Sequence, residues 1–148
     1  MLKKQLSKIG NSAICPVAVI VKDGKILMGH RHYTPDRWKT ISVWKCPGGR
    51  CDSGETTETT LRREVEEETG ITEFEILDYI DEVPGAKEGD SVPLFFCSTN
   101  QEPKLMEPHK FSEWRWIGFQ EFSQGFPENY INENARKVIV GFLSKILK

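Results

Sequence analysis

Glycines bracket the stretch of this chain that has the strongest structural preference. The stretch Thr57–Thr69 contains neither Gly nor Pro and is rich in Glu and Arg, and it lies between Gly48-Gly49 and Gly70. Such a composition favours a helix, and a glycine directly after the last residue favours a left-handed C-terminal cap. The sequence therefore predicts a helix over Thr57–Thr69 that ends at Gly70.

Three carboxylates of this helix are predicted to lie together. Glu64, Glu67 and Glu68 have the spacing i, i+3 and i+4, which places them on one helix face. Leu61 and Val65, four residues apart, supply apolar contact that can hold the helix against a sheet. Neighbouring carboxylates repel by about 0.2–0.5 kcal/mol per pair in water, and by more where solvent is excluded. A divalent cation resolves this repulsion, and clustered oxygen ligands on a rigid helix suit Mg²⁺.

Residues around the helix extend the prediction of a metal site. The Gly48-Gly49 turn allows close approach of the backbone, so the Gly49 carbonyl is a further candidate ligand. Arg63 is next to the carboxylates and is expected to hold one of them in a bidentate pair, with Glu55 as the obvious partner. The alternative is a solvated acidic helix, because Glu-rich helix faces are common.

The segment as a whole resembles the signature of the Nudix hydrolase superfamily, whose best-known branch is MutT-like. That signature is Gly, five residues, Glu, seven residues, and then Arg-Glu-apolar-x-Glu-Glu-x-Gly-apolar. The order of predicted elements, with strands on both sides of a loop-helix-loop and a closing helix, also resembles the family. The signature is met without departure by Gly49, Glu55, Arg63, Glu64, Val65, Glu67, Glu68, Gly70 and Ile71.

The resemblance implies an enzyme that hydrolyses a nucleoside diphosphate linked to another group, with the phosphates bridging divalent metal ions. Mg²⁺ is the implied cofactor, with Mn²⁺ as a possible substitute. Arg63 and Glu55 would organise the ligands, and the alternative for Glu55 is that it acts through a metal-bound water. The implied metal ligands are the Gly49 carbonyl and the carboxylates of Glu64, Glu67 and Glu68.

The general base is not specified by the signature, because it differs among branches of the family. Glu107 lies just before a predicted strand, Trp114–Ile117. This position resembles the place where some MutT-like enzymes keep a further acidic ligand or base. The alternative is a glutamate in a surface loop.

Cations in the loop from residue 30 to residue 40 are candidates for binding a phosphate chain. Arg31, Arg37 and Lys39 could attract phosphates, although such charges are often merely solvated.

Three further residues are candidates for contacts with the base of a nucleotide. Trp44 could stack on the base, although a strand Trp more often packs in the core. Asn132 and Asn134 lie beside the predicted closing helix, where MutT-like enzymes can place amides that read the base. The alternative role for either Asn is helix capping.

The remaining pattern predicts a mixed sheet between helices. Asp-Gly between two apolar runs indicates a hairpin, and apolar spacings of three and four near the end of the chain indicate a helix. The predicted fold class is an α/β/α sandwich of the Nudix type, formed by one domain over residues 1–148. The predicted strands are Ile14–Val21, Lys25–Gly29, Val43-Trp44, Phe74–Val83, Val92–Ser98 and Trp114–Ile117, and the helix runs through Ile131, Ala135, Val138, Phe142 and Ile146.

The net charge and the cysteines indicate which classes of partner and which cellular compartment to expect. A net charge of −2 with 28% charged residues gives no reason to expect a nucleic-acid polymer or a membrane surface as partner. Four cysteines with no secretory segment favour reduced thiols and a cytoplasmic location. A small-molecule nucleotide is the expected partner, and both a monomer and a homodimer remain open.

Three functions are compatible with these features. The leading hypothesis is a pyrophosphohydrolase that converts a nucleoside or deoxynucleoside triphosphate to the monophosphate and pyrophosphate. An ADP-ribose or nucleotide-sugar pyrophosphatase is the enzymatic alternative. A non-catalytic module that senses a nucleotide is the third, but such modules usually lose signature residues, and this chain has all of them.

Overall fold

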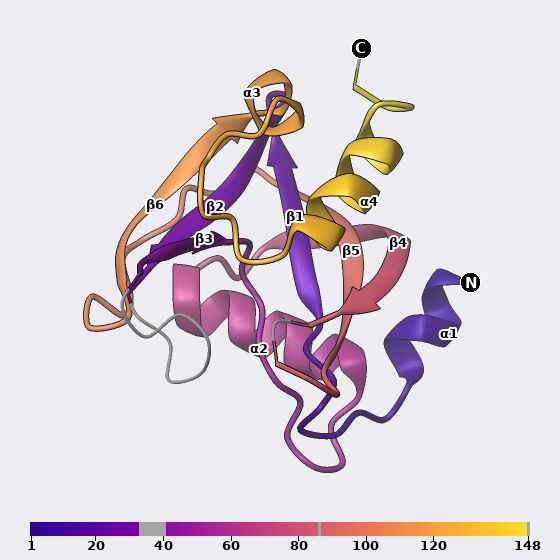
Figure 1. Ribbon diagram of the computed structural model, residues 1–148. Coiled ribbons are helices and arrows are strands. Elements are labelled where there is room, and N and C mark those ends of the chain that lie inside the picture. The colour runs from indigo at the N-terminus through magenta and orange to yellow at the C-terminus, as the bar shows by residue number, and fades with distance from the viewer. Residues whose placement is uncertain (33–40, 86, 148) are drawn as a thin grey trace.

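A six-stranded mixed sheet with helices on both faces forms the fold in this computed structural model, which describes residues 1–32, 41–85 and 87–147 (Figure 1). The predicted phosphate-binding residues Arg37 and Lys39 lie outside the described residues. In chain order the elements are α1 (Leu2–Ser7), β1 (Val17–Lys22), β2 (Lys25–Arg31), β3 (Val43–Lys45), α2 (Thr57–Thr69), β4 (Phe74–Pro84), β5 (Ser91–Thr99), β6 (Phe111–Gly118), α3 (Phe119–Ser123) and α4 (Glu133–Leu143).

The strand order is β3-β2-β1-β5-β4, with β6 paired to β2. The β1–β5 pair is parallel, with Val17 opposite Leu94, and the other pairs are antiparallel. The β1–β2 hairpin predicted from Asp-Gly is present, with Val21 opposite Ile26.

The loop before α2 forms backbone hydrogen bonds with the start of β1. Ala18 N–H donates to the Pro47 carbonyl (2.9 Å), and Gly49 N–H donates to the Pro16 carbonyl (3.3 Å). A Cβ atom at Gly48 would lie 2.4 Å from the Pro16 carbonyl oxygen, so this close approach requires glycine. Backbone pairing therefore fixes the Pro-Gly-Gly turn to the sheet, directly beside α2.

Alternate residues of β1 face the two helical layers. Val19 packs in a cluster with Ile139 of α4, whereas Ile20 packs in a second cluster with Leu61 and Val65 of α2. Because successive side chains of a strand point to opposite faces, one strand serves both cores. The predicted α/β/α sandwich with a mixed sheet is confirmed.

The α2 helix has the predicted bounds and both expected ends. Thr56 caps its N-terminus by accepting a hydrogen bond from Thr59 N–H at Oγ1 (3.2 Å). Gly70 ends the helix with φ of 74°, and its N–H donates to the Glu66 carbonyl (2.8 Å).

Several local features differ from the expectation. Helix α4 covers Glu133–Leu143 with Asn132 as its N-cap, so it is shorter at both ends than the predicted helix from Ile131 to Ile146. The short helices α1 and α3 have no predicted counterpart, because six and five residues are too few to show helical periodicity. The first strand begins at Val17 instead of Ile14, since Pro16 has no N–H to donate to a ladder. The strand predicted at Trp114 begins earlier, at Phe111.

The four cysteines are free, with three of them buried and Cys15 half-buried. Among the described residues, no helix is both long and apolar enough to cross a membrane.

Candidate functional site

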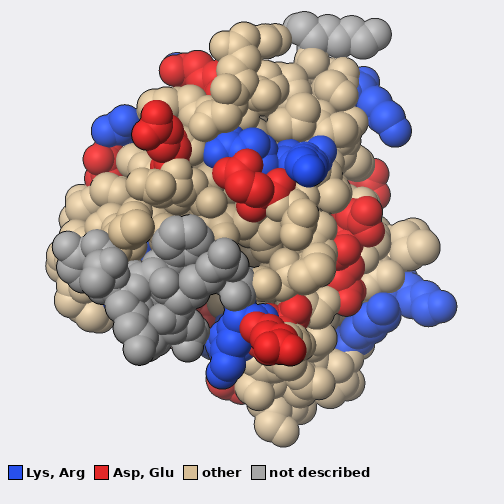
Figure 2. All heavy atoms as spheres, in the orientation of Figure 1, with Lys and Arg blue, Asp and Glu red and all other residues tan. Residues whose placement is uncertain are grey.

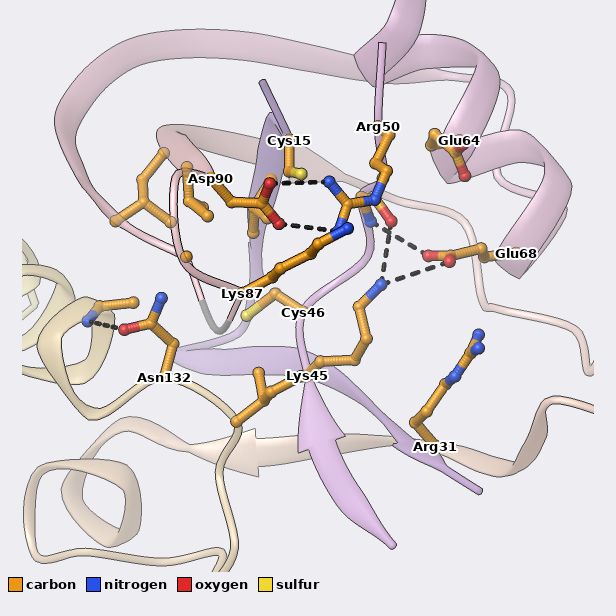
Figure 3. A pocket seen from close by; sticks show the side chains of 18 of the residues that line it. Cys15, Arg31, Lys45, Cys46, Arg50, Glu64, Glu68, Lys87, Asp90 and Asn132 are labelled. Atoms are coloured by element: carbon orange, nitrogen blue, oxygen red, sulfur yellow. Dashed lines mark hydrogen bonds and ion pairs between the residues drawn. The ribbon is translucent and has the colours of Figure 1, made fainter. Parts of the chain in front are cut away.

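A cavity of about 460 Å³ is lined by residues of the loop after β3, the start of β5, and helices α2 and α4 (Figure 3). Glu64 and Glu68 of α2 line one part of it, together with Gly49. Another part is apolar and includes Leu94 of β5 and Ala135 of α4. The cavity therefore has a carboxylate-lined side and an apolar side.

Glu68 is the most deeply placed carboxylate of the cavity. Its side chain is 6% exposed, and it accepts hydrogen bonds from Gly48 N–H (3.0 Å) and Lys45 Nζ (3.4 Å). Burial raises the pKa of Glu68 above its ordinary value, while Lys45 and the Gly48 hydrogen bond oppose this shift. A buried carboxylate with a raised pKa is a group that gains from a nearby cation.

Gly49 brings the backbone against the carboxylate of Glu64. A Cβ atom at Gly49 would lie 2.5–2.7 Å from the three terminal atoms of that carboxyl group. Burial raises the pKa of Glu64, and the negative charge of Glu68 raises it further. The Gly49 backbone and the Glu64 carboxylate thus lie in close contact, and backbone carbonyl and carboxylate oxygens are the donors that suit a hard divalent cation.

The predicted pair of Arg63 with Glu55 is present and bidentate. Arg63 Nε and Nη2 donate to the two carboxylate oxygens of Glu55 at 2.9 and 2.8 Å. Glu55 also accepts from Asp52 N–H (2.9 Å) and from the Thr60 hydroxyl (2.7 Å). The Arg63 hydrogen bonds are the main cause that lowers the pKa of Glu55 to about 2. These contacts fix the loop before α2 to the helix.

Arg63 also reaches the other carboxylates of α2. Its Nη1 donates to Glu64 (3.1 Å) and to Glu67 (3.2 Å), which is exposed. Among the residues that the structure describes, no three His, Cys, Asp or Glu side chains are grouped in a way that could hold an ion. Arg63 and Lys45 form ion pairs with these carboxylates. The assignment of Glu64, Glu67 and Glu68 as metal ligands stays a prediction.

Glu107 lies near Glu68 and outside the set of side chains that line the cavity. Its side chain is 22% exposed and pairs with Lys110 (3.5 Å). The raised pKa of Glu68 comes mainly from burial, and the negative charge of Glu107 adds to it. Glu107 is therefore within electrostatic reach of the site, while its role as ligand or base stays a prediction.

The residues predicted to bind substrate take different positions. Arg31 lines the cavity, with its guanidinium 5.7 Å from the centroid of Phe111. Trp44 is 9% exposed and stacks on His30 with centroids 4.6 Å apart, so it packs in the core and does not line the cavity.

The two asparagines also differ. Asn132 lines the cavity, but its amide is engaged on both sides. Its Oδ1 accepts from Ala135 N–H (3.0 Å), which caps α4, and its Nδ2 donates to the Pro84 carbonyl (2.9 Å). Asn134 is exposed on α4 and does not line the cavity. The capping alternative therefore describes Asn132, and neither amide points a free group at the cavity.

Several cavity residues were not found from the sequence. Lys45, Arg50, Lys87 and Lys110 line the cavity together with Arg31. Asp90 accepts from Arg50 at 2.9 and 2.7 Å in a bidentate pair, which joins the loop after Gly49 to the β4–β5 turn (Figure 3). No local pattern marks these residues, because strand pairing brings them together from separate segments.

On the face shown in Figure 2, the described residues form no broad basic surface. Basic and acidic side chains lie interspersed there. This distribution agrees with the net charge of −2.

Comparison with known proteins matches residues 13–140 to the family model described as NUDIX domain. An RNA pyrophosphohydrolase of Pelagibacter ubique is 30% identical over 125 residues, which cover 72% of this chain and 76% of that protein. A Xenopus laevis protein named nucleoside diphosphate-linked moiety X motif 6 is 48% identical over 62 residues, or 40% of this chain, and the match spans 26% of that relative's length. The crystal structure of a MutT protein from Methanosarcina mazei has a TM-score of 0.70 at 22% identity, and the match covers 92% of this chain and 96% of that one.

Proposed function

Because this chain belongs to the NUDIX domain family, we propose that it is a Mg²⁺-dependent pyrophosphohydrolase that converts a nucleoside or deoxynucleoside triphosphate to the monophosphate and pyrophosphate. The signature is complete from Gly49 to Ile71, which favours an enzyme over a non-catalytic sensing module. Four free thiols favour a reducing compartment, so we place the protein in the cytoplasm.

One observation carries the proposal: the backbone of Gly49 meets the carboxylate of Glu64 at the edge of a cavity that the buried Glu68 also lines. Burial raises the pKa values of Glu64 and Glu68 even though Arg63 and Lys45 pair with them, so these cations compensate the buried charge only in part. A bound divalent cation would explain why the two carboxylates lie together here, since a purely structural helix has no need of them.

The proposed ligands are the Gly49 carbonyl, Glu64, Glu67 and Glu68, with Mn²⁺ able to replace Mg²⁺. When bound, such ions neutralise phosphate charge and lower the pKa of the attacking water. Arg63 positions the site, because its guanidinium contacts Glu64 and Glu67 while it is fixed by Glu55. Arg63 Nη2 also donates to the Arg50 carbonyl (3.4 Å), which holds the loop after Gly49 against α2.

The two sides of the cavity suggest how a nucleotide would bind. Arg31, Lys45 and Lys110 lie with the carboxylates, and they suit a phosphate chain. The apolar side, between β5 and α4, suits the nucleoside. Because both groups of Asn132 are engaged, we expect affinity to depend more on the phosphates than on the base.

The general base is proposed to be Glu107. The electrostatic influence of Glu107 on Glu68 supports this proposal, because a general base must lie near the water that the metal ions bind.

A substrate panel with Mg²⁺ tests the proposal. The panel contains the NTPs, the dNTPs, oxidised dNTPs, ADP-ribose, a nucleotide sugar and dinucleoside polyphosphates. We expect the highest kcat/KM for triphosphates, with turnover abolished by EDTA and restored by Mg²⁺ or Mn²⁺. Preference for ADP-ribose or a nucleotide sugar would select the enzymatic alternative. Binding without turnover of any substrate would select the sensing module.

A second candidate substrate is RNA, because the Pelagibacter ubique relative is named RNA pyrophosphohydrolase. A short RNA with a 5′-triphosphate has the same reacting group as an NTP. Comparing kcat/KM for this RNA and for the matching NTP separates the two. The interspersed charges of Figure 2 and the net charge favour the free nucleotide.

A further inference from the structure

Lys45, proposed above to contact the phosphate chain, lies in an enclosed position against Glu68 that this role does not explain. It extends from β3 toward α2, and its side chain is 18% exposed (Figure 3). Its Nζ donates to the Gly48 carbonyl (2.9 Å) and to the Glu68 carboxylate (3.4 Å), and it lies 5.8 Å from the centroid of the Phe111 ring. A lysine at this depth loses hydration, so its contacts must compensate for it.

The surroundings of the ammonium resemble those of a bound cation. It contacts a backbone carbonyl and a buried carboxylate, and an aromatic ring lies beside it. Arg63 pairs with Glu55, Glu64 and Glu67, whereas Lys45 pairs with Glu68. The two basic side chains therefore divide the carboxylates of the site between them.

We propose that Lys45 is an internal counter-ion that competes with the divalent metal for Glu68. In the metal-free protein its ammonium keeps the Glu68 carboxylate and the Pro-Gly-Gly turn together. Binding of the divalent ion requires the ammonium to leave Glu68, and the freed side chain faces the cavity that is proposed to receive phosphates. Lys45 is thus a positioning residue, and the inference rests on the proposed metal site.

The test is metal binding by the substrate-free protein, measured as Mn²⁺ binding by electron paramagnetic resonance. Lys45→Met removes the charge and keeps most of the apolar stem. Glu68 in this variant can bind the ion without first losing its ion pair with an ammonium, and a tenfold change in Kd corresponds to about 1.4 kcal/mol. We therefore expect Lys45→Met to bind Mn²⁺ about tenfold more tightly than the parent.

Lys22→Met is the matched control. Lys22 is also half-buried, pairs with the carboxylate of Glu102, and lies 5.8 Å from the centroid of Trp116. It lies at the end of β1 and does not line the cavity. The Lys22→Met substitution should leave the Mn²⁺ affinity unchanged. Lys45→Arg, which keeps the charge, should bind Mn²⁺ no more tightly than the parent.

A second measurement uses the unaltered protein, so it does not depend on a variant that folds. Reductive methylation of lysines is followed by mass spectrometry with EDTA and with Mg²⁺. Displacement from Glu68 should make Lys45 react at least a few times faster with Mg²⁺, while Lys22 reacts at the same rate in both conditions.

The outcomes separate this inference from the proposed function. Equal or weaker Mn²⁺ binding by Lys45→Met, or methylation of Lys45 that Mg²⁺ does not accelerate, overturns the counter-ion role. A parent protein that binds no Mn²⁺ overturns the metal site itself, and with it the proposed function.

Discussion

At the scale of single residues, Glu68 is the carboxylate whose charge matters most. It is buried at the cavity, and it contacts Lys45 and the Pro-Gly-Gly turn beside α2. Glu68→Gln keeps its size and removes its charge. Metal ions contribute several kcal/mol to transition-state stabilisation, and each 1.4 kcal/mol is a tenfold change in rate, so we expect kcat to fall by about a thousandfold.

The fold of this variant should be intact, because an amide can still accept the hydrogen bond from Gly48 N–H. Circular dichroism and urea unfolding check the fold, and steady-state kinetics with Mg²⁺ check the rate. Near-normal turnover by a folded Glu68→Gln protein would show that Glu68 is not a metal ligand.

The prediction for Glu107 differs, because this residue does not line the cavity and only its charge acts on Glu68. If it accepts a proton during the reaction, Glu107→Gln should lower kcat by about 10²–10⁴-fold and change KM much less. Glu113→Gln is the control, because Glu113 is exposed on β6 and pairs with Arg115. Similar kinetics for Glu107→Gln and Glu113→Gln would assign Glu107 to the surface loop.

Glu55 predicts a dependence of stability on pH. Its pKa is lowered from 4.5 to about 2 in the folded protein, mainly by Arg63. A lowered pKa stabilises the fold above pH 4.5, and this contribution is lost as the pH falls from 4.5 to about 2. The stability lost in Glu55→Gln should therefore be constant above this window and shrink within it.

Urea unfolding at a series of pH values measures this difference in stability. Glu58→Gln, which removes an exposed pair with Arg62 on the same helix, is the control and should have little effect at any pH. A difference between Glu55→Gln and the parent that persists unchanged down to pH 2 would contradict the role of the Arg63–Glu55 pair.

At the scale of elements, the close contact of the Pro-Gly-Gly turn with α2 predicts that Gly49 cannot be replaced by a larger residue. The new Cβ of Gly49→Ala would lie 2.5 Å from the Glu64 carboxyl carbon. The flexible end of the Glu64 side chain must move away, so we expect weaker Mn²⁺ binding and lower kcat with little change in stability.

Gly141→Ala is the matched control for this substitution. A Cβ at Gly141 of α4 meets no atom within 4 Å, so this variant should gain about 0.5–1 kcal/mol from helix propensity and keep its metal binding. Equal metal affinity for the two variants would show that Gly49 does not contribute to the metal site.

At the scale of the whole molecule, the carboxylates and the apolar side of the cavity come from opposite helical layers, α2 and α4, with the sheet between them. Phosphates would bind at the α2 side whatever the base. We therefore expect kcat to vary less than KM among nucleoside triphosphates, with monophosphate and pyrophosphate as products. Metal ions chelated by adjacent phosphates stabilise a departing pyrophosphate or monophosphate.

Hydrolysis in ¹⁸O-labelled water identifies the attacked phosphorus, because the label enters the fragment that was attacked. Orthophosphate as a direct product, in the absence of a pyrophosphatase, would indicate a phosphatase on the same scaffold.

Local patterns determined the helix and its immediate neighbours. The bounds of α2, its left-handed end at Gly70 and the Arg63–Glu55 pair followed from residue types and spacings within one segment. Such features need only helical geometry and the freedom of glycine, which act over a few residues. The family and the fold class followed from the same segment and from the order of elements.

Tertiary structure decided the contacts between distant segments. The placement of Lys45 against Glu68, the pairing of Arg50 with Asp90 and the burial of Trp44 depend on which strands pair and which faces pack. A sequence specifies these through the collective packing of both cores, and no local spacing records them. For that reason the signature carboxylates and Arg63 could be predicted from the sequence, whereas Lys45, the cation that contacts Glu68, could be found only in the folded molecule.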